Sequence, residues 1–339
     1  MIKLLKTMLI INFLLLPQIA IAQSNNSSNQ FDESISIENP GAELWRNVRQ
    51  RDGTIQGSTQ MRGTDANSLI NVSGEAWRQY RMLDLIPKAG IALLVSLLGV
   101  FLFRVIRGNI LLEAGRSGIK ILRFTTSQRV VHWVTAILFI ILSLTGLLLL
   151  FGRSVLIPMI GAEAFSYFAV GAKFLHDYLG PVFAVSLVLL FIFFIKGNLP
   201  SLKQDLAWLA KGGGMLGRHA SSDRYNAGEK GWFWIAAFVG GAIVVSGFVL
   251  DFPIFGQSRE TMELFHVIHT IAATLMLIAS IGHIYMGTIA MDGTLEVMKT
   301  GYCDSNWAKE HHDIWYEKQL AAGKVPGQKV STTESSSKG

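Results

Sequence analysis

The sequence has 339 residues, of which 50% are hydrophobic and only 16% are charged, a balance that excludes an ordinary soluble domain and indicates a membrane protein with polar ends. Its formal net charge of +6 does not predict a nucleic-acid partner, because the Lys and Arg residues gather in short stretches beside apolar runs. The single cysteine, Cys303, excludes an intrachain disulfide, a cysteine-held iron–sulfur cluster and the C-x-x-C-H attachment of a c-type haem.

The N-terminal part of the chain is expected to be exported. Residues 1–22 have a positive start, a short apolar core and an A-x-A site, which predicts a cleaved signal peptide; the alternative is an uncleaved anchor helix. Residues 23–84 are polar and contain the pattern E-x-W-R-x-x-R twice, as ELWRNVR (43–49) and EAWRQYR (75–81). The repeat is either a docking surface for a partner protein or a pair of chance amphipathic turns.

Five apolar stretches are long enough to cross a membrane as helices. Basic residues concentrate in 108–129 and 196–230, whereas 152–174 and 251–263 carry few charges. The positive-inside rule then predicts a bacterial inner-membrane protein with a periplasmic N-terminus and a cytoplasmic tail, 291–339. The predicted spans are 85–107, 130–151, 175–195, 231–250 and 264–290.

The fifth span carries the most informative pattern in the sequence. It contains His266, His269 and His283, and His269 precedes His283 by 14 residues. At about 1.5 Å and about 100° per residue, these two imidazoles lie roughly 21 Å apart along a helix and within roughly 40° of the same face. Ionisable groups inside a membrane are costly and mark functional sites.

Two further histidines lie at matching depths on other spans. His132 is at the cytoplasmic end of the second span, level with His283, and His176 is at the outer end of the third span, level with His269. Bis-histidine ligation clamps a haem between imidazoles of facing helices. The pattern therefore predicts two haem b groups with these four histidines as iron ligands; the alternative is that they make interhelical hydrogen bonds.

The remaining histidines and the glycines receive structural interpretations. His266, one turn before His269, is expected to lie at the membrane–water interface; the alternative is that His266, rather than His269, is the outer haem ligand. His219 lies in a basic loop, and the adjacent His311 and His312 are interpreted as surface residues of the tail without a metal. Glycines of the spans are expected to allow close helix packing and, at some positions, the approach of a flat macrocycle: Gly146, Gly171, Gly180, Gly240, Gly241, Gly247 and Gly282.

Five segments carry a family resemblance: FTTSQRVVHW (124–133), FLHDYLGP (174–181), YNAGEKGWFW (225–234), IHTIAATLMLIASIGHIYM (268–286) and WAKEHHDIWY (307–316). They resemble the cytochrome b, or gamma, subunit of respiratory formate dehydrogenase over about residues 120–318. The resemblance implies an all-α membrane fold, in which a four-helix di-haem cytochrome b bundle over 130–290 follows one additional N-terminal transmembrane helix. It implies the same two ligand pairs.

The resemblance also implies a quinone site beside the inner haem, formed by the loop before the fourth span. On this chain its residues are Asn226, Gly228 and Glu229, close to His283. The short form of the family has Gln where this chain has Glu229, a carboxylate that can donate a proton to reduced quinone or simply pair with Lys230. Asn226 is also typical of the N-cap of a helix.

The implied function is electron transfer between formate oxidation and quinone. An iron–sulfur beta subunit on the periplasmic side delivers the electrons, and a molybdenum or tungsten alpha subunit carries out the formate chemistry, for which this chain has no residues. Quinone is reduced near the cytoplasmic side. The alternatives are the cytochrome b subunit of a hydrogenase or related reductase, and a non-haem membrane anchor.

Overall fold

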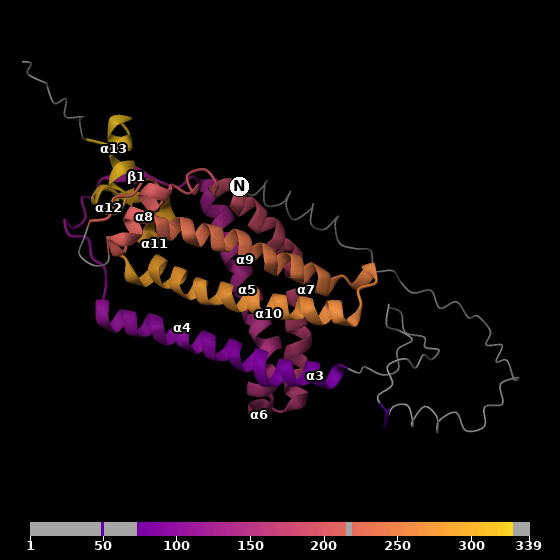
Figure 1. Ribbon diagram of the computed structural model, residues 1–339. Coiled ribbons are helices and arrows are strands. Elements are labelled where there is room, and N and C mark those ends of the chain that lie inside the picture. The colour runs from indigo at the N-terminus through magenta and orange to yellow at the C-terminus, as the bar shows by residue number, and fades with distance from the viewer. Residues whose placement is uncertain (1–48, 51–72, 215–218, 328–339) are drawn as a thin grey trace, which may run out of the picture. The chain divides into compact units, whose positions relative to one another are not determined.

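The computed structural model of the protein describes residues 49–50, 73–214 and 219–327 (Figure 1). The expected signal peptide, most of the exported segment with the first E-x-W-R copy, and the end of the tail lie outside the described residues. The chain divides into two compact units, Met1–Ala76 and Trp77–Gly339. The second unit contains every element discussed below except the first residues of one short helix.

Among the described residues, five helices are long and apolar enough to cross a membrane. The first span runs through three consecutive elements, α3 (Gly74–Gln79), the π-helix η1 (Tyr80–Leu85) and α4 (Ile86–Arg107). The other spans are α5 (Thr126–Val155), α7 (Ala162–Phe194), α9 (Ala227–Asp251) and α10 (Arg259–Tyr285), which continues into the π-helix η4 (Met286–Ala290). The prediction of an all-α membrane protein is confirmed.

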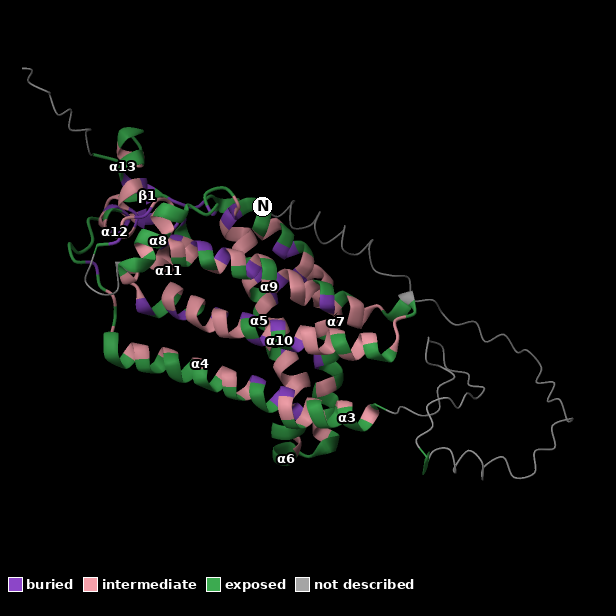
Figure 2. Ribbon diagram, viewed as in Figure 1, coloured by how far each residue is buried: buried purple, intermediate pink, exposed green. Residues whose placement is uncertain are grey.

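The five spans pack as two close pairs with an added helix. α5 packs on α7 and α9 packs on α10, α7 also contacts α9, and α4 lies along α10 (Figure 1). One end of these helices, here called the cap end, carries β1 (Lys120–Leu122) and β2 (Tyr302–Asp304); the other, the open end, carries α6 (Ile157–Ile160) and the 3₁₀ helix η3 (Pro253–Phe255). Figure 2 shows that much of the α4 surface is exposed, as expected of a helix that faces lipid.

Local sequence fixes where two spans begin at the cap end. The Thr125 hydroxyl accepts a hydrogen bond from the Gln128 amide, and the Gln128 side chain accepts one from the Thr125 amide. Asn226 and Glu229 form the same reciprocal capping box at the start of α9. Each box satisfies two backbone donors that the first turn of a helix leaves without partners.

The third span is longer than the sequence predicts. Residues 152–174, expected to be an outer loop, are mostly helical: α5 continues to Val155, α6 follows, and α7 begins at Ala162 after Gly161, whose φ of 82° ends α6. Hydropathy falls there because of charges such as Lys173, but Lys173 pairs with Asp177 one turn later at 2.7 Å and the helix continues. The third-span histidine therefore lies inside α7 rather than at its start.

The described part of the polar tail folds into a cap, whose core it shares with the loops before α5 and α9 and with the cap ends of α7 and α9. β1 pairs antiparallel with β2, which sets Ile121 opposite Cys303. Burial raises the pKa of the Cys303 thiol to about 11, so the thiol stays protonated. The interpretation of His312 as a surface residue is wrong, because it is only 1% exposed. The remaining cap elements are α8 (Leu202–Ala210), the 3₁₀ helix η2 (Gly212–Gly214), α11 (Thr294–Thr300), α12 (Ser305–His311) and α13 (Asp313–Ala321).

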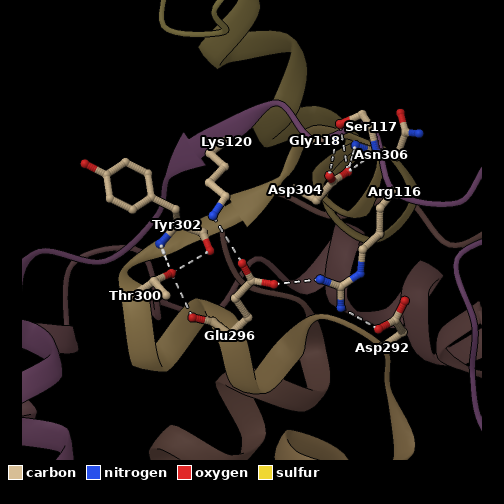
Figure 3. A network of polar contacts seen from close by, with 10 residues as sticks. All are labelled: Arg116, Ser117, Gly118, Lys120, Asp292, Glu296, Thr300, Tyr302, Asp304 and Asn306. Carbon is tan, nitrogen blue, oxygen red and sulfur yellow. Dashed lines mark hydrogen bonds and ion pairs between the residues drawn. The ribbon is translucent and has the colours of Figure 1, made fainter.

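A polar network holds the loop after α4 to the tail (Figure 3). Arg116 binds Asp292 at 2.6 Å and Glu296 at 2.7 Å. Asp304 accepts hydrogen bonds from the backbone of Ser117 and Gly118. The hydrogen bond from the guanidinium group holds the pKa of the Asp292 carboxyl below its ordinary value. These contacts bring two segments that are far apart in sequence to the same end of the helices.

Candidate functional site

The first histidine pair lies toward the open end, between α7 and α10. The ring centres of His176 and His269 are 6.2 Å apart, and the ring planes make an angle of 77°. Two imidazoles that share one metal stand about 6.3 Å apart, because metal–imidazole bonds are about 2.0–2.1 Å and each ring centre lies roughly 1.1 Å behind its nitrogen. The fold therefore brings the predicted outer pair to the separation that shared ligation requires.

Each ring of this open-end pair rests against a hydroxyl residue that is followed by glycine. On α5, Thr145 Oγ1 lies 2.9 Å from Nδ1 of the α7 ring, and a Cβ on Gly146 would lie 3.2 Å from that ring. On α9, Ser246 Oγ lies 3.0 Å from Nδ1 of the α10 ring, and a Cβ on Gly247 would lie 3.3 Å from it. The Ile243 carbonyl is 3.1 Å from the same Nδ1. Hydrogen bonds at Nδ1 orient both rings and leave each Nε2 for a metal.

The second histidine pair lies toward the cap end, between α5 and α10. The ring centres of His132 and His283 are 6.3 Å apart, with an angle of 54° between the ring planes. Trp232 on α9 stacks on the His283 ring with centres 4.2 Å apart and planes at 11°, and Trp133 meets the His132 ring edge-on. His132 Nδ1 is buried without a hydrogen-bond partner among the described residues. The rings of this cap-end pair are thus held mainly by aromatic contacts.

Both pairs fit a haem held by two histidines. The separations suit one iron between each pair of rings, and imidazoles in apolar surroundings are the ligand set of a b-type haem. Two glycines stand where a larger residue would press on the imidazole rings of the open-end pair. At the cap end, the two imidazoles come from α5 and α10, which are not among the closely packed pairs of described helices.

His266, the predicted rival for the outer ligand, has another partner. Arg81 Nε donates a hydrogen bond to His266 Nε2 at 3.2 Å, and Trp77 meets the same ring edge-on with centres 5.7 Å apart. Both partners belong to EAWRQYR, the second E-x-W-R copy. That copy therefore attaches the N-terminal span to α10, while His269 is the imidazole that faces α7.

The residues predicted for quinone binding form the start of α9. Asn226 Oδ1 accepts from the Glu229 amide at 2.9 Å, and a Glu229 carboxylate oxygen accepts from the Asn226 amide at 3.0 Å. A Cβ on Gly228 would lie 3.2 Å from Asn226 Oδ1 and 3.3 Å from the Trp208 ring. The loop is thus a helix cap, as one of the two interpretations expects, and a side chain at its glycine would press on Asn226 and Trp208.

The Glu229 carboxylate binds a residue that the sequence did not suggest. Arg123 Nη2 lies 2.9 Å and 3.2 Å from its two oxygens. The alternative partner, Lys230, binds Asp205 at 2.8 Å instead. One turn along α9 from Glu229, Trp232 stacks on the α10 ring of the cap-end pair. The predicted quinone residues and the aromatic side chain that packs on the predicted inner ligand therefore belong to the same first turns of α9.

Several residues of the site were missed by sequence reasoning. Thr145, Ser246 and Trp232 support the histidine rings, and Arg123 and His312 lie beside Glu229. A signal existed for the first two, because each hydroxyl directly precedes a glycine, in LTG (144–146) and VSG (245–247). Nothing in the sequence indicates that Arg123 and His312 are neighbours.

Apolar spanning helices with imidazole pairs between them define a membrane cytochrome b. A family model described as prokaryotic cytochrome b561 matches residues 123–301, more than half of the chain. The chain also aligns with three curated relatives. It therefore belongs to the formate dehydrogenase cytochrome b556 subunits of that family.

The relatives align over somewhat more than half of this chain and over most of their own length. The cytochrome b556(fdo) subunit of formate dehydrogenase from Escherichia coli (strain K12) is 30% identical over 201 residues, which are 58% of this chain and 92% of the relative. The nitrate-inducible cytochrome b556(Fdn) subunit of the same strain is 28% identical over 58% and 90%. The formate dehydrogenase cytochrome b556 subunit of Haemophilus influenzae is 25% identical over 59% and 84%.

Proposed function

We propose that this chain is the membrane electron-transfer subunit of a formate dehydrogenase complex. It holds two haem b groups and passes electrons from an iron–sulfur partner to a quinone. The observation that carries the proposal is the presence of two imidazole pairs at two depths, with ring centres 6.2 Å and 6.3 Å apart. A bis-histidine haem iron supplies reversible one-electron transfer.

The four histidines are the proposed iron ligands. His176 and His269 hold the haem at the open end, and His132 and His283 hold the haem at the cap end. The hydroxyls at Nδ1 of the open-end rings fix which nitrogen faces the iron, and the Trp232 face fixes the ring of His283.

The proposed orientation follows from the charges of the loops. The basic stretches 108–129, 196–214 and 219–230 lie at the cap end, which the positive-inside rule assigns to the cytoplasm. The open end then faces the periplasm, where an iron–sulfur beta subunit and a molybdenum or tungsten alpha subunit deliver the electrons of formate. Separation of the two haems across the membrane makes the electron transfer contribute to a membrane potential.

Quinone binds at the cap end in this proposal, beside the start of α9. Asn226, Gly228 and Glu229 form the helix N-terminus, where the macrodipole favours the negative charge that develops on a reduced quinone oxygen. Glu229 is the candidate proton donor, and its side chain is 36% exposed, so a quinone oxygen can approach it. Trp232, one turn after Glu229 on α9, stacks on His283 of α10.

The test is a matched pair of alanine variants on α10. The complex with His269→Ala is expected to lose one of two low-spin b-type signals in the reduced-minus-oxidised spectrum, whereas His266→Ala is expected to keep both. The two positions are one turn apart, so damage to the helix itself would affect both variants. Two retained haems in His269→Ala would contradict the ligand assignment.

The complex itself tests the partners. Native mass spectrometry of the complex purified from membranes is expected to show this chain with an iron–sulfur subunit and a molybdenum- or tungsten-containing subunit. A nickel–iron partner would instead identify a hydrogenase cytochrome b, and absence of a b-type signal from the wild-type chain would identify a non-haem anchor.

A further inference from the structure

A buried arginine lies at the centre of the cap. The Arg123 side chain is 1% exposed, and its guanidinium carbon lies 4.8 to 5.8 Å from the centres of four aromatic rings. Nη2 donates to the Glu229 carboxylate and to the Arg224 carbonyl, while Nη1 has no partner among the described residues. A buried cation with one carboxylate partner depends strongly on that partner, because an unpaired buried charge is very costly.

A buried histidine faces the same carboxylate from the other side. His312 Nδ1 lies 2.8 Å from the Asp223 carbonyl and 3.0 Å from Ser222 Oγ, and His312 Nε2 lies 3.7 Å from a Glu229 oxygen. Burial and the Arg123 guanidinium hold the pKa of His312 well below its ordinary value, so the ring is neutral.

The hydrogen bonds of His312 fix its tautomer. A carbonyl can only accept, so the Asp223 carbonyl requires the ring proton on Nδ1. The Ser222 hydroxyl directs its own hydrogen to the His311 carbonyl at 2.6 Å, which leaves its oxygen free to accept from the same Nδ1. The neutral ring therefore turns a bare lone pair on Nε2 toward Glu229.

We propose that Arg123 and His312 are positioning residues that let Glu229 exchange a proton at the quinone site. Arg123 binds the carboxylate form of Glu229, and the Nε2 lone pair of His312 accepts a hydrogen bond from the acid form. This inference rests on the proposed function, because it assumes that quinone is reduced at the cap end.

The proton balance follows from these contacts. Two-electron reduction of a quinone requires two protons; the O–H bond of protonated Glu229 breaks and an O–H bond forms on one quinone oxygen, while solvent supplies the second proton. The electrons come from the proposed electron transfer. The Glu229 carboxylate that remains binds Arg123 and then takes a proton from water on its solvent-exposed side. The hydrogen of the re-formed acid then points to Nε2 of His312. The other charged or titratable groups of the cluster are Asp223, Arg224, Tyr225, His311 and Lys230, of which Lys230 binds Asp205 and burial lowers the pKa of His311.

The test compares pH profiles of formate-dependent quinone reduction in the whole complex. His312→Asn keeps a donor at the Nδ1 position for the Asp223 carbonyl but removes Nε2, so the acid form of Glu229 loses its acceptor. We expect the rate to fall about tenfold on the alkaline side of the profile and less than twofold on its acid side, as loss of one hydrogen bond allows. Arg123→Gln removes the partner of the carboxylate form, and the alkaline fall of the rate is expected to move to higher pH.

The proposal predicts that the alkaline fall of the rate moves to lower pH in His312→Asn and to higher pH in Arg123→Gln. A merely structural role of the two residues would instead lower the rate of both variants at every pH. His311→Asn is the matched control, with an unchanged profile expected, and Arg123→Lys serves if Arg123→Gln lacks a normal haem spectrum. Shifts in the same direction, or an unmoved profile in His312→Asn, would overturn the inference. If Glu229→Gln keeps the full rate, the proposed protonation of quinone by Glu229 is wrong as well. If Glu229→Gln is slow but the Arg123 and His312 variants keep the wild-type profile, only the proposed roles of Arg123 and His312 are wrong.

Discussion

The two histidine pairs are supported in different ways. At the open end, hydroxyls from α5 and α9 and a backbone carbonyl bind the Nδ1 atoms. At the cap end, Trp232 covers one ring, and His132 Nδ1 is buried without a partner among the described residues. The same side-chain type is thus held by hydrogen bonds at one depth and by aromatic contact at the other.

The difference has a consequence for electron transfer. A hydrogen bond that Nδ1 donates makes an imidazole a stronger donor to its metal, which favours the oxidised iron. Aromatic contact fixes the orientation of a ring without this effect. We therefore expect the open-end haem to have the lower reduction potential, so that electrons move favourably toward the cap end, the direction that the proposed function requires.

The largest effect that would separate the two pairs is steric. In Gly247→Val the new side chain meets the α10 ring of the open-end pair, since even a Cβ would stand 3.3 Å from it. We expect the purified variant to lose the open-end haem and to keep the other, measured by haem content and by redox titration. Gly241→Val is the matched control on α9, because a Cβ there meets nothing within 4 Å. Equal loss of both haems would contradict the proposal that each histidine pair binds its own haem.

The cap-end pair is expected to respond to Trp232. Trp232→Ala removes a ring that stacks on His283 with centres 4.2 Å apart. Such contacts contribute about 0.5–1.5 kcal/mol, so the cap-end haem should dissociate up to about tenfold more readily while the open-end signal stays constant. Trp232→Phe keeps an aromatic face and is expected to restore most of the retention. Loss of only the open-end haem in Trp232→Ala would show that Trp232 does not support the cap-end pair.

A subtler change should move a potential without removing a haem. Thr145→Val and Ser246→Ala each delete a hydrogen bond at Nδ1 of the open-end pair. We expect each to raise the midpoint potential of the open-end haem by on the order of tens of millivolts, because one hydrogen bond is worth about 1 kcal/mol and 59 mV corresponds to a tenfold change for one electron. The cap-end potential is the internal reference, and a shift there instead would refute the comparison.

The spans and the histidine pairs were predictable because both depend on simple geometry. Apolar length defines a spanning helix, and the 14-residue spacing places His269 and His283 on one face at two depths. The ring supports were not predictable, because a hydroxyl inside a helix commonly bonds a carbonyl of its own helix. Thr145 Oγ1 does so with Ile141 as well as approaching the His176 ring, and both choices look alike in sequence.

The cap was hidden from sequence reasoning for a different reason. Its core joins short segments from distant parts of the chain, such as Ile121 with Cys303 and Arg123 with Trp307. None of these segments is long enough to show a periodic apolar pattern, and the charged residues between them resemble a solvated tail. The burial of His312 follows only from the tertiary contacts.

The smallest predicted effect concerns the polar network of the cap. Its measurement tests whether the cap-end histidine pair depends on this network. The pKa of Asp292 is held below its ordinary value of 3.8 by Arg116, so this contact stabilises the cap above that pH and is lost as the pH falls through the lowered pKa. In Asp292→Asn we expect faster hydrogen exchange in α11 at pH 7. The free energy of local opening should fall by less than about 1 kcal/mol, because the pair is partly exposed and Arg116 also binds Glu296. At a pH below the lowered pKa of Asp292 the variant and the wild type should converge, and added salt should shrink the difference at pH 7. The cap-end haem spectrum should not change, because Trp232 and the helices, rather than this network, hold that pair; a spectral change in Asp292→Asn would show that the cap also positions the ligands.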